Sequence, residues 1–270
     1  MTEKHETIEA LAKSIFESFR TKKFTADASF PIAEISLDEA YAVQDAVTEF
    51  RVESGETVVG YKVGCTSRTI RKQFGLREPI VGKLFRQHVH NAAQTRELFW
   101  SDYVNCAIEP ELVLSIGKDL EGTNVSDHEM IDSIEYVSAG LELHHFHSWF
   151  GSPTAQELIC ANGIHAGLIV GAERVSPTTL IFQNELFEVR QNRILVTQAL
   201  ASEIMGGPLH SLRWLIRHLN EKQQRLKAGS LVIPGSPVEL IRIESESEVT
   251  VMIESVGRLT TQFQNRLPNV

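Results

Sequence analysis

The succession of strand-like segments is the feature of this sequence that most limits its fold. From about residue 85 onward, short apolar segments follow one another, and several alternate apolar and polar residues with the period of two of a half-buried strand. The candidate strands are 106–116, 136–146, 165–171, 179–187, 192–197, 231–233, 238–243, 248–254 and 258–263. Residues 180–196 and 248–263 are typical of hairpins. A single helix is predicted among them, at 208–225, with Pro208 in its first turn.

The N-terminal part has a helical pattern instead. In residues 5–20 the apolar side chains recur every three or four positions, as a one-sided helix requires; they are Ile8, Leu11, Ile15 and Phe19. A second helix is predicted from Ser36, because Ser36 and Glu39 have capping-box spacing. A strand at 56–64 and a short helix ended by Gly75 follow. The sequence therefore predicts an α+β protein with a small helical N-terminal region, residues 1–85, and a larger β part, residues 86–270.

Composition excludes several classes of protein. The chain has 26 basic against 35 acidic residues and a net charge of -9, which argues against nucleic acid or an anionic membrane as partner. No apolar stretch approaches the roughly 18 residues of a membrane-spanning helix, and the N-terminus lacks the apolar core of a signal peptide. The three cysteines lie far apart, which predicts neither a disulfide framework nor a paired-cysteine site. These features predict a cytoplasmic protein.

The stretch "CAIEPELVL", residues 106–114, places two acids in an otherwise apolar strand. Glu109 and Glu111 are two residues apart, so they project from the same face. Pro110 cannot donate a ladder hydrogen bond, which predicts a sheet edge or a bulge at this point. Glu142 is a third acid in a strand-like context. If the three carboxylates converge, they suit Mg²⁺ or Mn²⁺; spacing alone leaves open that all three face solvent.

Lysine and histidine side chains add further candidates. Lys62 in "GYKVGCTS" could be an acid/base, a holder of an anionic substrate, or a lysine whose stem packs while its ammonium reaches water. On a strand His144 shares the face of Glu142, whereas His145 and His147 share the other. Ligation of a softer metal by these histidines and proton transfer by one of them are both open. No serine-nucleophile elbow, phosphate loop or dinucleotide fingerprint is present.

Several segments, in this order, resemble one known family: "GYKVGCTS", "RKQFGLREPIVGKL", "IEPELVLSIGKDLEG", "GLEL", "ANGIHAGLIVG", "GGPLHSLRWLIRHL" and "LKAGSLVIPGS". The family is that of 2-keto-4-pentenoate hydratase and 4-oxalocrotonate decarboxylase, within the fumarylacetoacetate hydrolase superfamily. The resemblance extends from about residue 35 to residue 263. It implies a mixed β-roll of the fumarylacetoacetate hydrolase C-terminal type, preceded by a small helical region.

The resemblance also implies a site. Glu109, Glu111 and Glu142 would ligate one divalent cation, usually Mg²⁺ or Mn²⁺, and Lys62 matches the family's active-site lysine. The residues that fall where the family lines its substrate pocket are Gln73, Asn162, Gly235 and Ser236. A small 2-oxo acid would be the substrate. Family members usually self-associate, which implies a homo-oligomer and leaves room for a complex with a paralogous enzyme of the same pathway.

Two positions depart from the family pattern. His145 stands where the family commonly has an aspartate, and Ala161 stands where it commonly has another. We hypothesise that His145 replaces a carboxylate as acid/base. In a flat strand His145 faces away from Glu142, so this hypothesis requires a bend or a bulge.

The activity implied by the resemblance is metal-dependent hydration of 2-hydroxypenta-2,4-dienoate-like substrates to 4-hydroxy-2-oxo acids, as in aromatic or steroid breakdown. Decarboxylation of 2-oxo-3-hexenedioate is the nearest alternative, because it needs almost the same groups without the water. Two further alternatives are open: an acylpyruvate hydrolase, which the histidines would suit, and a non-catalytic partner of an active paralogue, which the missing acids would suit.

Overall fold

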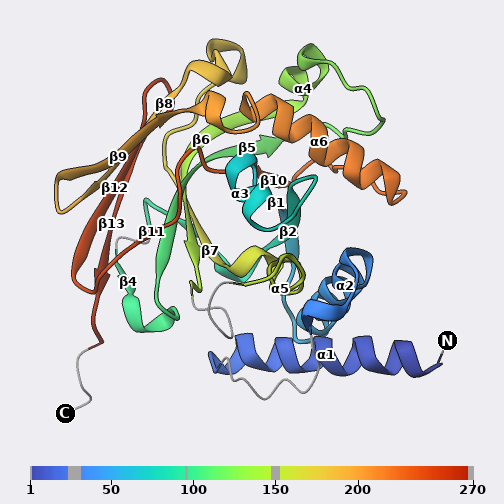
Figure 1. The fold of residues 1–270 in the computed structure, drawn as a ribbon. Helices are drawn as coiled ribbons and strands as arrows, with labels where there is room; N and C mark the ends of the chain where they lie inside the picture. Colours follow the sequence, from blue (N-terminus) through green and yellow to red (C-terminus); the bar gives the residue numbers. More distant parts are fainter. Residues whose placement is uncertain (1, 24–31, 95–96, 147–152, 267–270) are drawn as a thin grey trace.

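A computed structural model describes residues 2–23, 32–94, 97–146 and 153–266. Its helices are α1 (Thr2–Thr21), α2 (Leu37–Glu53), α3 (Arg68–Gln73), α4 (Asp127–Ser133), α5 (Ala155–Cys160) and α6 (Pro208–Glu221). Within the described ranges, none of these helices combines the length and apolarity needed to cross a membrane. Figure 1 shows α1, α2 and α5 grouped on one side of the molecule, with α6 along another.

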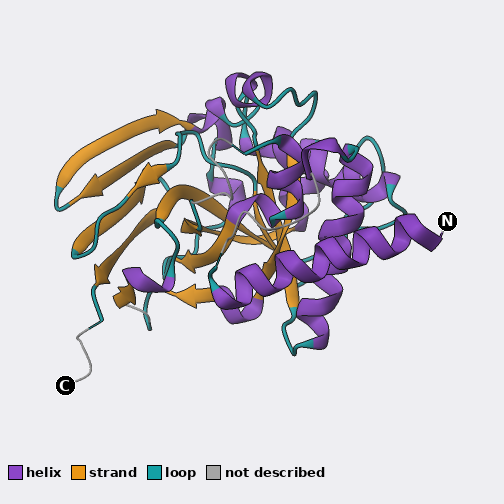
Figure 2. Cartoon of the chain, turned by 60° about the horizontal axis from the view of Figure 1, so that its bottom comes forward, coloured by secondary structure: helices purple, strands orange, loops and turns teal. Residues whose placement is uncertain are grey.

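The strands form two sheets (Figure 2). The strands are β1 (Val58–Gly64), β2 (Ile80–Phe85), β3 (Val89–Asn91), β4 (Glu97–Phe99), β5 (Ala107–Ile116), β6 (Ile134–His144), β7 (His165–Val170), β8 (Leu186–Gln191), β9 (Ile194–Leu200), β10 (Leu231–Ile233), β11 (Ile241–Arg242), β12 (Ser247–Ile253) and β13 (Gly257–Gln264). The eight-stranded sheet has the order β2-β1-β10-β5-β6-β7-β3, with β11 also paired to β5, and the five-stranded sheet has the order β4-β13-β12-β8-β9. The predicted α+β class is confirmed.

Among the described residues, three hydrophobic clusters hold these layers together, and two of them are large. The larger core joins both sheets and α6, with Leu112, Leu141, Phe187 and Leu215 among its fully buried side chains. A smaller core lies under α1, α2 and α5. The long antiparallel β5–β6 pair contributes to the larger core along most of its length. The site described below lies on this pair.

Most predicted elements are present, and two strand predictions are wrong in part. At 179–187 the chain forms the short helical turns Pro177–Thr179 and Phe182–Asn184, and β8 begins only at Leu186. Leu180 and Phe182 are both buried, so their spacing of two imitates a strand although it arises in turns. In the predicted strand 238–243 only Ile241–Arg242 pairs.

Both predicted hairpins form. The first joins β8 to β9 and has a two-residue turn in which Asn192 and Arg193 have φ of 51° and 69°. Positive φ at both turn residues matches the twist of paired strands. The second hairpin joins β12 to β13. The first lies further along the chain than predicted, because the turns around Phe182 precede it.

The predicted division into residues 1–85 and 86–270 stays a prediction. β1 and β2 precede that boundary, yet β1 pairs with β10 and β2 within the eight-stranded sheet. This pairing ties the N-terminal half of the chain to β5 and β6, and it places Lys62 of β1 in the same sheet as the three glutamates.

The capping box of α2 offers a test of the helical region. Ser36 Oγ accepts a hydrogen bond from the Glu39 N–H at 3.2 Å, and Glu39 Oε2 accepts from the Ser36 N–H at 2.8 Å. We expect Ser36→Ala to lower the free energy of unfolding by about 1 kcal/mol, because the Glu39 N–H at the helix start loses its acceptor. Chemical denaturation measures this. Ser18→Ala in the exposed part of α1, where the hydroxyl only bonds the Ser14 carbonyl, is the control and should change stability by less than about 0.5 kcal/mol.

Candidate active site

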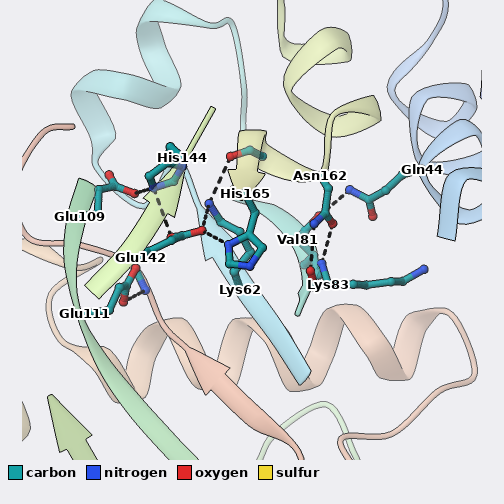
Figure 3. A network of polar contacts seen from close by, with 12 residues as sticks. Gln44, Lys62, Val81, Lys83, Glu109, Glu111, Glu142, His144, Asn162 and His165 are labelled. Atoms are coloured by element: carbon teal, nitrogen blue, oxygen red, sulfur yellow. Dashed lines mark hydrogen bonds and ion pairs between the residues drawn. The ribbon is translucent and has the colours of Figure 1, made fainter. Parts of the chain in front are cut away.

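The three glutamates lie on one face of the β5–β6 pair (Figure 3). In the strand register Glu109 is opposite Glu142, and Glu111 is opposite Gly140. Directly opposed residues project from the same face of a sheet, so all three carboxylates share it. Pro110 is opposite Leu141 of β6. On the other side of β5, β11 pairs with residues before Pro110 and β10 with residues after it, so among the described residues no strand pairs with Pro110 on that side. The edge predicted from Pro110 is present in this local sense.

Two of the three carboxylates are fully buried. Glu111 is 1% exposed and Glu142 is 0% exposed, whereas the Glu109 side chain is 21% exposed. The alternative in which all three face solvent is therefore wrong. Burial raises the pKa of Glu111 well above its usual range, and the neighbouring charges of Glu142 and Glu109 raise it further. The acidic groups on this face therefore repel one another, and their burial removes the water that would weaken this repulsion.

Lys62 supplies the positive charge inside the cluster. Its Nζ lies 2.8 Å from Glu142 Oε1 and donates to the Gly163 carbonyl at 3.3 Å. Burial alone would lower the pKa of Lys62, but Glu142, Glu109 and Glu111 outweigh it, so that pKa is raised. Burial alone would raise the pKa of Glu142, but Lys62, His144 and His165 outweigh this effect, so that the pKa of Glu142 is lowered. Lys62 is only 3% exposed, so its ammonium does not reach water.

The contact between Lys62 and Glu142 requires a strongly curled sheet. In the order β1-β10-β5-β6 the two strands are three places apart. A flat sheet would separate them by roughly 14 Å, at about 4.8 Å for each pair of strands. Only curling of the sheet toward this face lets the two side chains meet at 2.8 Å.

Glycines make room for the lysine side chain. A Cβ atom on Gly82 would lie 2.8 Å from Lys62 Cγ, and one on Gly163 would lie 3.2 Å from Lys62 Nζ. Gly163 is in a left-handed conformation, with φ of 63°, as are its neighbours Asn162 and Ile164. The Asn162 amide fixes this turn, because it accepts from the Lys83 N–H at 2.6 Å and donates to the Lys83 carbonyl at 2.9 Å.

Two histidines complete the cluster. His144 Nε2 is 3.0 Å from Glu109 Oε2 and 3.5 Å from Glu142 Oε2, and His165 Nδ1 is 2.7 Å from Glu142 Oε1. Burial lowers the pKa of His165 to about 4, although Glu142 opposes the shift. The period-two argument already placed His144 on the face of Glu142. Sequence reasoning missed His165, whose signal was a polar residue opening the apolar strand "HAGLIV".

The structure does not bring His145 into this cluster. Its ring lies against Phe19 and Tyr103, with centroids 5.9 Å and 6.1 Å away, and its Nδ1 accepts from the Val104 N–H. Burial lowers its pKa to about 3. β6 ends at His144, and although the β6–β7 register shifts between Leu143 and His144, the His145 ring lies away from the cluster. His147 lies outside the described residues.

The other predicted pocket residues differ in their placement. The Gly235 N–H donates to Glu111 Oε2 at 3.0 Å, in a left-handed conformation with φ of 115°, and its missing side chain leaves room for Thr66. Ser236 Oγ accepts from the Val238 N–H. Gln73 is exposed at the end of α3, and the described chain gives it no hydrogen bond to the cluster. Ala161 is buried at the end of α5. Gly235 thus orients a carboxylate, and the substrate-binding roles stay predictions.

The donor atoms of the cluster fit a divalent cation. Ligand atoms of Glu109, Glu142 and His144 all lie within 4.8 Å of one another. Glu111 Oε1, Glu142 Oε2 and His144 Nε2 are buried atoms without a hydrogen bond. The 3.0 Å contact between His144 and Glu109 is therefore close but not aligned as a hydrogen bond. Buried polar atoms without partners are costly, and a cation among them would satisfy them. Carboxylate oxygens are the ligands that Mg²⁺ and Mn²⁺ prefer.

Known proteins resemble this chain along nearly its full length, although no family model matches it. A 2-keto-4-pentenoate hydratase of Paraburkholderia xenovorans is 25% identical over 267 residues, which cover 97% of this chain and 96% of the relative. A solved 4-oxalocrotonate decarboxylase from Pseudomonas putida G7, complexed with magnesium and adipate, aligns with a TM-score of 0.90 and 21% identity over 96% of this chain and 98% of that one.

A more distant likeness concerns the fold alone. A fumarylpyruvate hydrolase from Pseudomonas aeruginosa, in complex with Mn²⁺ and pyruvate, aligns with a TM-score of 0.58 and 16% identity over 77% of this chain and 90% of that one. The predicted β-roll fold of the fumarylacetoacetate hydrolase type is thereby confirmed. Along nearly its full length the chain is thus similar to a 2-keto-4-pentenoate hydratase, and it has the fold of the solved 4-oxalocrotonate decarboxylase.

Proposed function

We propose that the protein is a metal-dependent hydro-lyase of short 2-hydroxy-dienoic acids. It would add water to 2-hydroxypenta-2,4-dienoate-like substrates and release 4-hydroxy-2-oxo acids. The observation that carries this proposal is that Glu109 and the buried Glu111 and Glu142 share one face near Lys62, in a chain whose full-length relatives include hydratases.

The residues that would hold the cation are Glu109, Glu111 and Glu142, and Mg²⁺ or Mn²⁺ is the ion that we propose. When bound, such a cation supplies Lewis-acid chemistry to a 2-oxo acid, whose carboxylate and keto oxygens are hard ligands. Glu111 Oε1 and Glu142 Oε2, which have no hydrogen bond in the described part of the chain, support this assignment. Among the described residues, the ligand atoms that lie together also include one from His144.

Lys62 is the proton carrier in this proposal. Hydration needs a proton delivered to carbon, followed by addition of water to the conjugated double bond. Lys62 Nζ and His165 Nδ1 both contact Glu142 Oε1, at 2.8 Å and 2.7 Å. Glu142 can therefore keep the lysine protonated and in place, and the cationic Nζ can pair with the substrate carboxylate. The backbone of Gly235 holds Glu111, while Gln73, Asn162 and Ser236 remain proposed pocket residues with no contact to a substrate yet assigned.

Decarboxylation of 2-oxo-3-hexenedioate would use the same residues, with carbon dioxide leaving in place of water adding. The assay that separates the two offers each acid to the purified protein with Mg²⁺ or Mn²⁺. It follows the loss of dienoate absorbance and the release of carbon dioxide. We expect water addition without carbon dioxide. Carbon dioxide release from the diacid would identify a decarboxylase, and silence with both acids in the metal-loaded protein would contradict our proposal and favour the non-catalytic partner.

Removal of the metal is a further test. We expect dialysis against a chelator to abolish turnover and Mg²⁺ or Mn²⁺ to restore it. Added Mg²⁺ should also raise the melting temperature, since a ligand at 100 times its dissociation constant stabilises the folded state by about 2.7 kcal/mol. Chelator-treated protein assayed after return of the metal controls for irreversible loss. Full activity in the metal-free protein would contradict the assignment.

The biological setting belongs to the same proposal. The family resemblance supports a cytoplasmic, self-associating enzyme of aromatic or steroid ring breakdown. A complex with a paralogous enzyme of that pathway is compatible with it.

A further inference from the structure

A second group of charged side chains surrounds a groove between α3 and α6, two elements that lie next to each other in Figure 1. The groove has a volume of about 340 Å³. Its lining contains four arginines and a single acid, which are Arg71, Arg77, Arg213, Arg217 and Glu78. In a chain with a net charge of -9, this is a local excess of positive charge of the kind that attracts anions.

Pairing within the protein leaves part of this charge uncompensated. Arg213 is paired with Asp127, and Arg217 Nη2 lies 2.9 Å from Glu78 Oε1. Arg71 donates through Nη1 to the carbonyls of Cys65 and Thr66, at 3.2 Å and 2.5 Å. These carbonyls are neutral, so its charge is not offset. Arg77 has no ion pair or hydrogen bond within the described part of the chain. The groove therefore holds two guanidinium groups without a counter-charge.

The N–H groups of Arg217 and Trp214 beside the groove also have too few hydrogen-bond acceptors. Within the described part of the chain the buried Nε of Arg217 has no hydrogen bond, and Glu221 Oε1 lies 3.6 Å from it. An unpaired buried N–H is costly. The Trp214 indole N–H and Arg217 already share the Glu78 carboxylate. Donors thus outnumber acceptors around this cavity.

The groove is distinct from the glutamate cluster. None of Glu109, Glu111, Glu142 or Lys62 lines it. The segment Cys65–Thr66 connects the two places, since Arg71 holds its carbonyls on one side and Thr66 packs against Gly235 on the other. The two places also differ in charge: the acidic glutamate cluster favours a cation, whereas the arginine-lined groove favours an anion.

We propose that the groove between α3 and α6 binds a small anion with two or more negative charges, either phosphate or a dicarboxylate, through Arg77 and Arg71. The guanidinium group presents paired N–H donors that match the oxygens of both anion types. A cavity of about 340 Å³ lies at the lower end of the range for small-molecule sites, which restricts the ligand to a compact anion. The proposal does not rest on the hydratase function.

The test measures anion binding to the metal-free protein by calorimetry. Inorganic phosphate and glutarate are titrated separately, with sodium chloride keeping the ionic strength constant because salt screens such contacts. Arg77→Glu should weaken binding at least tenfold, and it should fold normally since Arg77 has no partner to lose. Arg258→Glu is the matched control, because Arg258 is an exposed arginine of β13 that has no ion pair or hydrogen bond with the other described residues. It should bind as the wild type does.

Glu111→Gln distinguishes the groove from the glutamate cluster, and it should leave anion binding unchanged. Binding of phosphate alone or of glutarate alone would support the site and identify the class of its ligand. The proposal is overturned if neither anion binds with a dissociation constant below about 10 mM, if Arg77→Glu and Arg258→Glu have equal effects, or if Glu111→Gln abolishes binding.

Discussion

Glu111→Gln is expected to stabilise the metal-free protein and, at the same time, to abolish its response to Mg²⁺. The buried Glu111 carboxyl lies with Glu142 and Glu109, and its burial and their charges raise its pKa. Glutamine keeps the shape and can still accept from the Gly235 N–H. It removes the ionisable group, so we expect a gain on the order of 1–3 kcal/mol in the metal-free state at neutral pH.

The sign of the pH dependence follows from the direction of this shift. A carboxyl whose pKa is raised by folding favours the folded state below its unfolded pKa and loses that contribution as the pH rises toward the raised value. The stabilisation by Glu111→Gln should therefore grow as the pH increases above the ordinary glutamate range. Thermal unfolding at several pH values measures it.

The same variant should lose the proposed metal and with it most of the turnover. A Lewis-acid contribution of several kcal/mol corresponds to a loss on the order of 10³-fold in kcat/KM. Glu135→Gln on the paired strand β6 is the control, because Glu135 is exposed and its carboxylate accepts only from the Ser115 hydroxyl among the described residues. If Glu111→Gln kept both its Mg²⁺-dependent stabilisation and its activity, Glu111 would not be a ligand.

Lys62→Met should have the second large effect, and here the metal-free protein is expected to lose stability. The Lys62 ammonium is the buried counter-charge of Glu142, and removing one partner of a buried ion pair typically costs about 3–5 kcal/mol. With the proposed cation bound, part of this loss should be recovered, because the cation takes over the compensation. Mg²⁺ should bind at least as tightly as in the wild type, since a neighbouring positive charge has been removed.

Turnover should nevertheless fall by roughly 10²–10⁴-fold, the usual contribution of a positioned proton-transfer group. Lys83→Met provides the matched control: Lys83 lies opposite Tyr61 on the adjacent strand, and its ammonium pairs with Asp45 rather than with the cluster. Near-normal kcat in the metal-saturated Lys62→Met protein would rule out Lys62 as proton carrier.

The part of the site that lies on β5 and β6 could be predicted from the sequence because it depends on local geometry. Strand alternation puts Glu109 and Glu111 on one face, and the same rule puts His144 beside Glu142. The same rule predicted that His145 faces away from Glu142, and its ring indeed lies against Phe19.

The remaining part depends on strand order and sheet curvature, which local patterns do not encode. The contact between Lys62 and Glu142 spans three strand places in a curled sheet. His165 reaches Glu142 because β7 pairs with β6, a pairing between segments that are separated by α5. The resemblance to a known family indicated Lys62, whereas His165 lies in the segment "ANGIHAGLIVG" without having been singled out there.

The most direct test of the central claim, a divalent cation held by three carboxylates, is anomalous diffraction from crystals of the protein grown with Mn²⁺. We expect one strong Mn²⁺ peak within ligand distance of Glu109, Glu111 and Glu142, with Lys62 outside the coordination shell. A peak bound by Glu109, Glu142 and His144 without Glu111, or no peak at this face of the β5–β6 pair, would contradict the account.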